Sequence, residues 1–400
     1  MSERERLVPF DRGKRQPDPA RIAEFAATAR KLQQERETAA GVVTRLLNET
    51  PYAEWGKLGG REELRNSGAL EKLGQEAVTR RHTNPLESLA IAALATTIAD
   101  ALPDDLYPPI VTAQLRAHAW KDRGLALCNV ARYVESLDAT ARAEQILAPF
   151  GTLAHDRAIV RLVRASTLQE IQRFDDALGN VRQCKQVFVD HGDDRRHLIC
   201  GVIEGNILHR MGHHREAREV FISLLPQARQ NSDRESLASI HNNIGHSSIE
   251  IEDFDTAEAH LHQAIVLFTE LDEPLRVARA ELARGRLLVR RGQIDLGVSL
   301  LRNVRERFLR HQLVEEGGLC GLEIVEALLL RGSPLEAELL ARRIVNEFTA
   351  AQLSTRAITA IGYLSDAIAA RHASPATAKH VMRYIQSLRT KPDLEFEASA

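Results

Sequence analysis

Five stretches of this 400-residue sequence repeat one pattern at intervals of forty residues. A small residue marks the same position of each stretch, at Ala177, Ala217, Ala257, Gly297 and Ala337. Twelve positions earlier stand Ala165, Gly205, Gly245, Gly285 and Val325. Four positions later stand Val181, Phe221, Leu261, Leu301 and Ala341. A fixed period of this length predicts stacked structural units, each of which buries its apolar face against the next.

The spacing within a stretch predicts two antiparallel helices. Two helices approach closely only where neither carries a bulky side chain, so the small residues mark the crossing and the larger apolar ones fill the space around it. Gly212, Gly292 and Gly332 stand where a left-handed residue would end the first helix. Aromatic residues make up only 4% of the chain, which leaves little of the material that sheets prefer. We therefore expect an all-α protein.

The pattern resembles the tetratricopeptide repeat (TPR) family over about residues 120–350. Its forty-residue period is that of the long-helix members of the family, and the composition of the chain resembles that of bacterial members. The resemblance implies a right-handed α-solenoid of antiparallel helix pairs, whose first helices line a concave groove. One feature departs from the family. The usual aromatic near the end of the first helix is replaced by Leu168, Leu208, Ser248, Leu288 and Leu328.

Outside the clear repeats, we expect a tail without structure over residues 1–17 and an N-terminal helical region over 18–105. This region should hold helices near 19–48, 61–82 and 86–102. The run LPDDLYPP at 102–109 is the expected boundary. Residues 106–390 should form the solenoid of six to seven helix pairs, and 391–400 a loose tail.

The resemblance implies that motif positions 2, 5, 9, 12 and 13 of each first helix face the groove. Asn206, Asn242 and Asn243 are the strongest candidates there, because an amide offers both a donor and an acceptor and can hold the backbone of an extended peptide. The alternative is that these amides bond neighbouring helix ends or water. All the predicted groove residues are Asn206, His209, Arg210, Asn242, Asn243, His246, Arg279, Arg286 and Arg290.

Ten arginines and three acidic residues occur between Arg276 and Arg310. Three of these arginines, Arg279, Arg286 and Arg290, map to the groove, where their guanidinium groups would suit a carboxylate or a phosphate. The alternative is a solvated face with acidic partners on neighbouring turns.

No metal site, cofactor or catalytic centre is expected. His209 and His213 have a spacing that can hold zinc, but His213 falls in a turn and no H-E-x-x-H motif occurs. Asp193 or Asp194 in the loop DHGDDRRH is read as a helix N-cap. The four cysteines are far apart and form no C-x-x-C pair, which favours reduced thiols in a helical core. The sequence contains no phosphate-binding glycine loop, nucleophile elbow or kinase motif, so we expect a protein that is not an enzyme.

Charge and hydropathy limit the partners. The 53 Lys and Arg residues nearly balance the 55 Asp and Glu residues, so no overall field favours nucleic acid or a membrane. The N-terminal segment has no apolar core of the kind a signal peptide needs. These features predict a cytoplasmic protein of undetermined oligomeric state.

Three functions remain open. The first is a scaffold or adaptor whose groove binds a protein or an extended peptide, with acidic ligands among the candidates. The second is a peptide-responsive bacterial regulator whose N-terminal helices respond to occupancy of the groove. The third is an accessory subunit of a separately encoded enzyme or DNA-binding partner.

Overall fold

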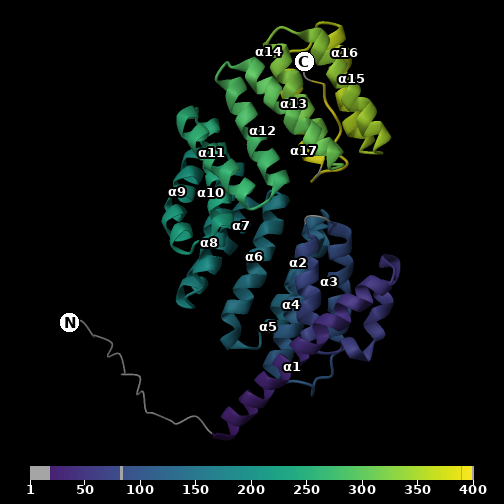
Figure 1. Cartoon of the computed structure of the whole chain (residues 1–400), viewed down its shortest axis with the longest axis vertical. Helices are drawn as coiled ribbons and strands as arrows, with labels where there is room; N and C mark the ends of the chain where they lie inside the picture. Colours follow the sequence, from purple (N-terminus) through teal and green to yellow (C-terminus); the bar gives the residue numbers. More distant parts are fainter. Residues whose placement is uncertain (1–18, 82–83, 389, 399–400) are drawn as a thin grey trace, which may run out of the picture. The chain divides into compact units, whose positions relative to one another are not determined.

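The computed structural model describes residues 19–81, 84–388 and 390–398 and is helical throughout, with no strand in these ranges (Figure 1). The first part of the chain forms α1 (Pro19–Glu49), the 3-10 helices η1 (Tyr52–Gly60) and η2 (Glu62–Leu64), α2 (Ser67–Arg80), α3 (Pro85–Asp100), α4 (Pro109–Asn129) and α5 (Tyr133–Leu147). The bounds of α1 and α3 lie close to the helices predicted near 19–48 and 86–102. The helix predicted near 61–82 begins only at Ser67, after the 3-10 helices η1 and η2, which were not predicted. The predicted tail at 1–17 lies outside the described residues.

The chain divides into two compact units. Unit 1 comprises the residues up to Val130 together with 141–150, and unit 2 comprises 131–140 together with the residues from Gly151 onward. The sequence placed the boundary at 102–109, but α4 packs on α2 and α3 and belongs to unit 1. Arg116 on α4 explains part of this attachment, because its guanidinium donates to the carbonyls of Ala99 (3.2 Å) and Leu102 (2.8 Å) at the end of α3.

Unit 1 has its own apolar core, built from α1 to α4 and η1. Trp55 is buried in it and donates from its indole nitrogen to the carbonyl of Thr50 (3.0 Å). A second contact fixes α1 against α2: the carboxylate of Glu35 accepts hydrogen bonds from the hydroxyl groups of Ser67 (2.6 Å) and Tyr107. Gly68 permits this close approach, since a Cβ there would lie 2.2 Å from the backbone oxygen of Glu35.

Unit 2 is a regular array of helix pairs after the 3-10 turn η3 (Gly151–Leu153). Its pairs are α6 (Ala154–Glu170) with α7 (Phe174–Asp190), α8 (Asp194–Arg210) with α9 (His214–Gln230), α10 (Arg234–Glu250) with α11 (Phe254–Glu270), α12 (Pro274–Arg290) with α13 (Ile294–Arg310), and α14 (Val314–Leu330) with α15 (Pro334–Ala350). A last pair follows, α16 (Thr355–Ala369) and α17 (Pro375–Leu388). The first five pairs begin at intervals of forty residues, so the predicted period is confirmed.

The predicted left-handed turns are present. Gly212, Gly292 and Gly332 have φ angles of +85°, +81° and +78°. Gln172 and Glu252 occupy the corresponding places in two other pairs with φ of +61° and +62°. In all five turns the next N–H bonds a carbonyl five residues back, as in the Schellman motif, which explains why non-glycine residues are held there.

The helix crossings also follow the predicted register. A Cβ on Gly205 would lie 2.5 Å from the ring of Phe221, and one on Gly245 would lie 2.6 Å from Leu261. Gly205 and Gly245 stand in the first helices, and Phe221 and Leu261 are the larger residues predicted to pack around the crossings. Since these contacts join α8 to α9 and α10 to α11, the small residues do permit the close approach of each pair.

The last helix departs from the repeat. α17 packs on α14, the first helix of the preceding pair, as well as on its own partner α16. In the described array, the corresponding helices of the earlier pairs have no contact of comparable extent. Residues 391–398 were expected to be loose but instead contact this helix: the phenol of Tyr384 donates to the carbonyl of Leu394 (2.9 Å), and the ring of Phe396 lies 4.9 Å from that of Tyr384.

Candidate ligand groove

Three asparagine side chains form a connected row on the first helices α8 and α10. The amide nitrogen of Asn243 donates to the side-chain oxygen of Asn206 (2.9 Å), and that of Asn242 donates to the side-chain oxygen of Asn243 (3.4 Å). All three side chains are half-buried. The side-chain oxygen of Asn242 is buried and has no hydrogen-bond partner. The predicted amides therefore come together and leave one acceptor unsatisfied.

Histidines extend this polar row. A ring nitrogen of His209 lies 3.2 Å from the hydroxyl of Ser247 and 3.2 Å from a ring nitrogen of His214. Burial lowers the pKa of His209, and the adjacent His214 lowers it further. The ring is therefore held neutral, with one nitrogen able to donate and the other to accept.

His246 lies further along α10. Burial lowers its pKa to about 3, with contributions from the positive charge of Arg286 and from His209. It is therefore neutral at ordinary pH and offers a hydrogen-bonding ring rather than a cation.

The predicted arginines are mostly paired with carboxylates of neighbouring repeats. Arg286 binds Glu323, and the guanidinium of Arg290 lies 3.2 Å from the carboxylate of Glu250. Arg210, also predicted for the groove, is paired too: it lies 2.8 Å from Glu170. The arginine-rich repeat is thus largely neutralised by acids that precede or follow it by about forty residues.

Arg279 differs from the other predicted arginines. Its side chain is exposed, and in the described part of the chain it has no carboxylate partner. Of the three arginines assigned to an anion site, it is the one whose charge stays available without breaking an internal ion pair.

A cavity of about 390 Å³ lies where α17 approaches the first helices α10, α12 and α14. Arg286, Arg290 and Glu250 line one side of it, and Lys379 and Arg383 on α17 line the other. The ammonium group of Lys379 lies 3.1 Å from Glu326 on α14. The repeat pattern could not reveal this wall, because α17 leaves the stacking order of the other helices.

A second histidine pair lies between α10 and α11. Ring nitrogens of His241 and His260 are 2.9 Å apart, so one ring must donate its proton to the other. Burial lowers the pKa of His241 to about 4 and also lowers that of His260. The repeat pattern did not show which histidines pair.

The features considered for metal binding have structural roles. Asp193 caps α8, since its side chain accepts a hydrogen bond from the backbone N–H of Arg196 (3.0 Å). His213, predicted to fall in a turn, lies 3.5 Å from Glu216. Across the described ranges, no group of three or more potential metal ligands comes together. Among the described residues none of the four cysteines forms a disulfide with another, and three of them are buried.

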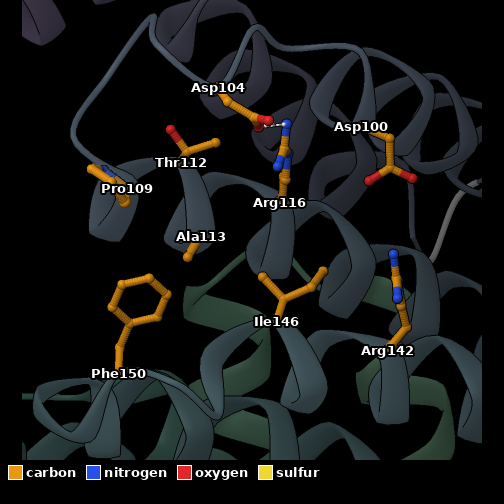
Figure 2. Close-up of a pocket in the computed structure, with 9 residues that line it drawn as sticks. All are labelled: Asp100, Asp104, Pro109, Thr112, Ala113, Arg116, Arg142, Ile146 and Phe150. Carbon is orange, nitrogen blue, oxygen red and sulfur yellow. Dashed lines mark hydrogen bonds and ion pairs between the residues drawn. The ribbon is translucent and has the colours of Figure 1, made fainter.

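Unit 1 contains a separate cavity of about 550 Å³ (Figure 2). Its apolar wall includes Ile146 and Phe150, and Asp104 lies 2.9 Å from Arg116 at one side. Figure 2 shows Arg142 extending from α5 towards this cavity. The site lies within unit 1 and was not predicted from the sequence.

The sequence and the fold were also compared with those of known proteins. No protein-family model matches the sequence, and no curated protein matches it either. Among the described helices, none is both long enough and apolar enough to cross a membrane.

Many solved structures are similar in fold, and three of them are described here. Aspartyl phosphate phosphatase F from Bacillus subtilis has a TM-score of 0.55 and 8% identity over 70% of this chain and 70% of that chain. A Rap protein complexed with Competence and Sporulation Factor has a TM-score of 0.53 and 16% identity over 91% and 98%. A signal transduction ATPase with a tetratricopeptide repeat sensor, from Pyrococcus horikoshii, has a TM-score of 0.58 and 10% identity over 90% of this chain. The match spans 53% of that ATPase.

The fold of this chain is therefore the all-helical repeat fold of tetratricopeptide proteins, as the forty-residue pattern predicted.

Proposed function

We propose that the chain is a non-enzymatic binding protein whose first helices hold an extended peptide or a segment of a partner protein. The observation that carries this proposal is the asparagine row on α8 and α10, which ends at the unpartnered oxygen of Asn242. A buried acceptor without a partner costs about 1–3 kcal/mol, so a ligand donor would recover part of that cost once the Asn242 amide turns its buried oxygen towards the groove.

A peptide backbone suits this row because each of its residues except proline offers one N–H donor and one carbonyl acceptor. The amides of Asn206 and Asn243 already bond each other, which holds them in position before a ligand arrives. Side-chain amides that bind backbone groups would accept many ligand sequences.

Two of the similar structures support a role in ligand recognition. The Rap protein was solved in complex with Competence and Sporulation Factor, and the Pyrococcus ATPase carries its tetratricopeptide repeats as a sensor. By analogy, we assign this chain to proteins that respond to a bound ligand. We also propose a cytoplasmic location, because buried cysteines that are not linked in disulfides within the described residues suit a reducing compartment.

An acidic ligand is the finer part of the proposal. Arg279 on α12 is exposed and has no carboxylate partner in the described structure, so it can meet an acidic side chain. Arg286 and Arg290 would need to exchange Glu323 and Glu250 for the ligand, and they contribute less for that reason. Binding of acidic peptides should therefore weaken in Arg279→Ala and become less sensitive to salt.

The test uses a displayed library of random peptides. We expect the wild-type protein to enrich peptides that the variant Asn242→Ala binds much more weakly. Asn303→Ala is the matched control, because Asn303 is an exposed asparagine on the second helix α13. Equal binding by all three proteins, or no enrichment at all, would contradict a peptide-binding asparagine row.

A regulator is the second candidate, and the separate core of unit 1 favours it. An adaptor that used only the groove would not need this additional unit. A peptide enriched on the wild-type protein should then change hydrogen exchange in α1 to α3. Exchange changes confined to unit 2 would leave the adaptor as the better description.

The alternative to a non-enzymatic protein is phosphatase activity, because the fold is similar to that of the Bacillus phosphatase. An aspartyl phosphate is an acyl phosphate, so acetyl phosphate is a simple probe. We expect no hydrolysis above the rate in buffer, and a protein-dependent rate would contradict this part.

A further inference from the structure

Leucines occupy the outer face of α15 at positions that are polar or small in the other repeats. Leu335 and Leu339 are 76% and 70% exposed. The four preceding second helices have Asp295, Asp255, Arg215 and Asp175 in place of Leu335, and Ser299, Ala259, Glu219 and Gly179 in place of Leu339. Since the backbone repeats, these leucines are not needed to build a helix pair, and their exposure requires another explanation.

The two leucines act together with a cavity beside them. They lie one turn apart on α15 and therefore on the same side of the helix. A cavity of about 310 Å³ between α13 and α15 is lined by Leu339, with Ile324 and Leu328 from α14 among its other walls. We call Leu335, Leu339 and this cavity the α15 patch. It offers both a projecting apolar ridge and a space that can receive one.

One unpaired charge of each sign lines the same cavity. Glu306 on α13 and Arg343 on α15 are both exposed. Within the described ranges neither has an ion-pair partner, whereas Arg302 pairs with Glu336 (2.9 Å) beside them. Rotating a second copy of the patch about a two-fold axis places its cation against the first copy's anion, and the reverse contact follows by symmetry.

The charges around the patch favour a second copy over a strongly acidic or basic partner. The cavity is lined by Glu306 and Arg343, one charge of each sign, and by two arginines that are paired within the chain, Arg302 with Glu336 and Arg305 with Glu347. A surface without net charge neither repels its own copy nor attracts a highly charged protein.

We propose that the α15 patch is a self-association surface through which two copies of this chain pair about a two-fold axis. Leu335 and Leu339 of each copy pack against the α13–α15 cavity of the other. Glu306 of one copy pairs with Arg343 of the other, twice. This inference does not depend on the proposed peptide groove, which lies on the first helices.

The first test replaces the leucines by the residues of the preceding repeat, in the double variant Leu335→Asp with Leu339→Ser. Sedimentation velocity over a wide concentration range should show a dimer for the wild-type protein. The double variant should dimerise about 100-fold more weakly or not at all, because central apolar side chains carry much of an interface's energy. Val189→Asp, an exposed apolar residue of α7, is the control and should dimerise like the wild type.

A charge exchange tests the pairing itself. Glu306→Arg and Arg343→Glu should each weaken the dimer by about 10-fold, since each places like charges opposite each other. Combining the two should restore dimerisation close to the wild-type level, because the pair re-forms between copies with its signs exchanged. An ion pair within one copy would not affect dimerisation in any of these variants.

Three results would overturn the proposal. The first is a wild-type protein that stays monomeric at every concentration. The second is a dimer unaffected by the leucine double variant. The third is crosslinking from position 339 to another segment of the same chain or to a different protein, which would identify another occupant.

Discussion

Gly205→Ala tests the close helix crossing on which the whole array depends. The added methyl group would lie 2.5, 2.6 and 2.9 Å from three ring carbons of Phe221, whose side chain is only 1% exposed. Carbon atoms pack best at about 3.5–4.0 Å, so the overlap is about 1 Å and the enclosed ring must move. Such overpacking typically costs about 1–3 kcal/mol.

Helix propensity acts in the opposite direction. Alanine is favoured over glycine inside a helix by about 1 kcal/mol. The net destabilisation of Gly205→Ala should therefore be about 0–2 kcal/mol. In a unit of this size each kcal/mol corresponds to about 2–4 °C in melting temperature.

Gly179→Ala is the matched control within α7. Nothing lies within 4 Å of the position where its Cβ would be placed, so it should gain the propensity term alone. Urea unfolding followed by circular dichroism should move the two variants in opposite directions from the wild type. If Gly205→Ala is as stable as Gly179→Ala, the crossing is not tightly packed and the register argument is wrong.

Three further predictions concern the same unit. Ala257→Leu places a branched side chain at a fully buried crossing, so it should destabilise by about 1–3 kcal/mol; an unchanged urea midpoint would contradict the packing. Burial lowers the pKa of His241 to about 4 and also lowers the pKa of His260. Folding therefore favours the neutral forms of both rings, and the free energy of unfolding should fall as pH drops from about 6.5 towards 4. His241→Asn should flatten this decline. Arg286→Ala leaves the Glu323 side chain, which is only 11% exposed, without its cation, so this variant should lower the free energy of unfolding by about 1–3 kcal/mol. Adding Glu323→Gln should recover part of this loss.

The fold was predictable because its determinants are local and periodic. Small residues such as Gly205 and turn glycines such as Gly212 recur in a fixed register, and each unit contacts mainly its neighbours. Gln172 and Glu252 show the limit of this reasoning. They adopt the same left-handed turn as the glycines, but their side chains give no sign of it, because the hydrogen bonds of the turn hold them there.

The pairing of the candidate site residues was less predictable than the fold. Asn206 and Asn243, both assigned to the groove from the sequence, stand on adjacent first helices and bond each other. The register placed Arg286 in the groove as a free cation, whereas the structure pairs it with Glu323, which lies almost one full repeat later. Ion pairs between repeats depend on rotamers and on the angle between units, and a single sequence pattern contains neither. The α17 wall was unpredictable for a related reason, because it breaks the period.

The packing of α17 on α14 also limits the length of the groove. The first helices α6, α8, α10 and α12 follow one another up to the cavity in which Lys379 and Arg383 of α17 face α10 and α12. Neighbouring helices are spaced at about 8–10 Å, so three spacings give about 24–30 Å. An extended chain covers about 3.3–3.6 Å per residue, and that span corresponds to about seven to nine residues. Such a groove would limit the length of peptide that it holds. A short free peptide would fit along its full length, and a longer one would bind only if its additional residues extend beyond the open end.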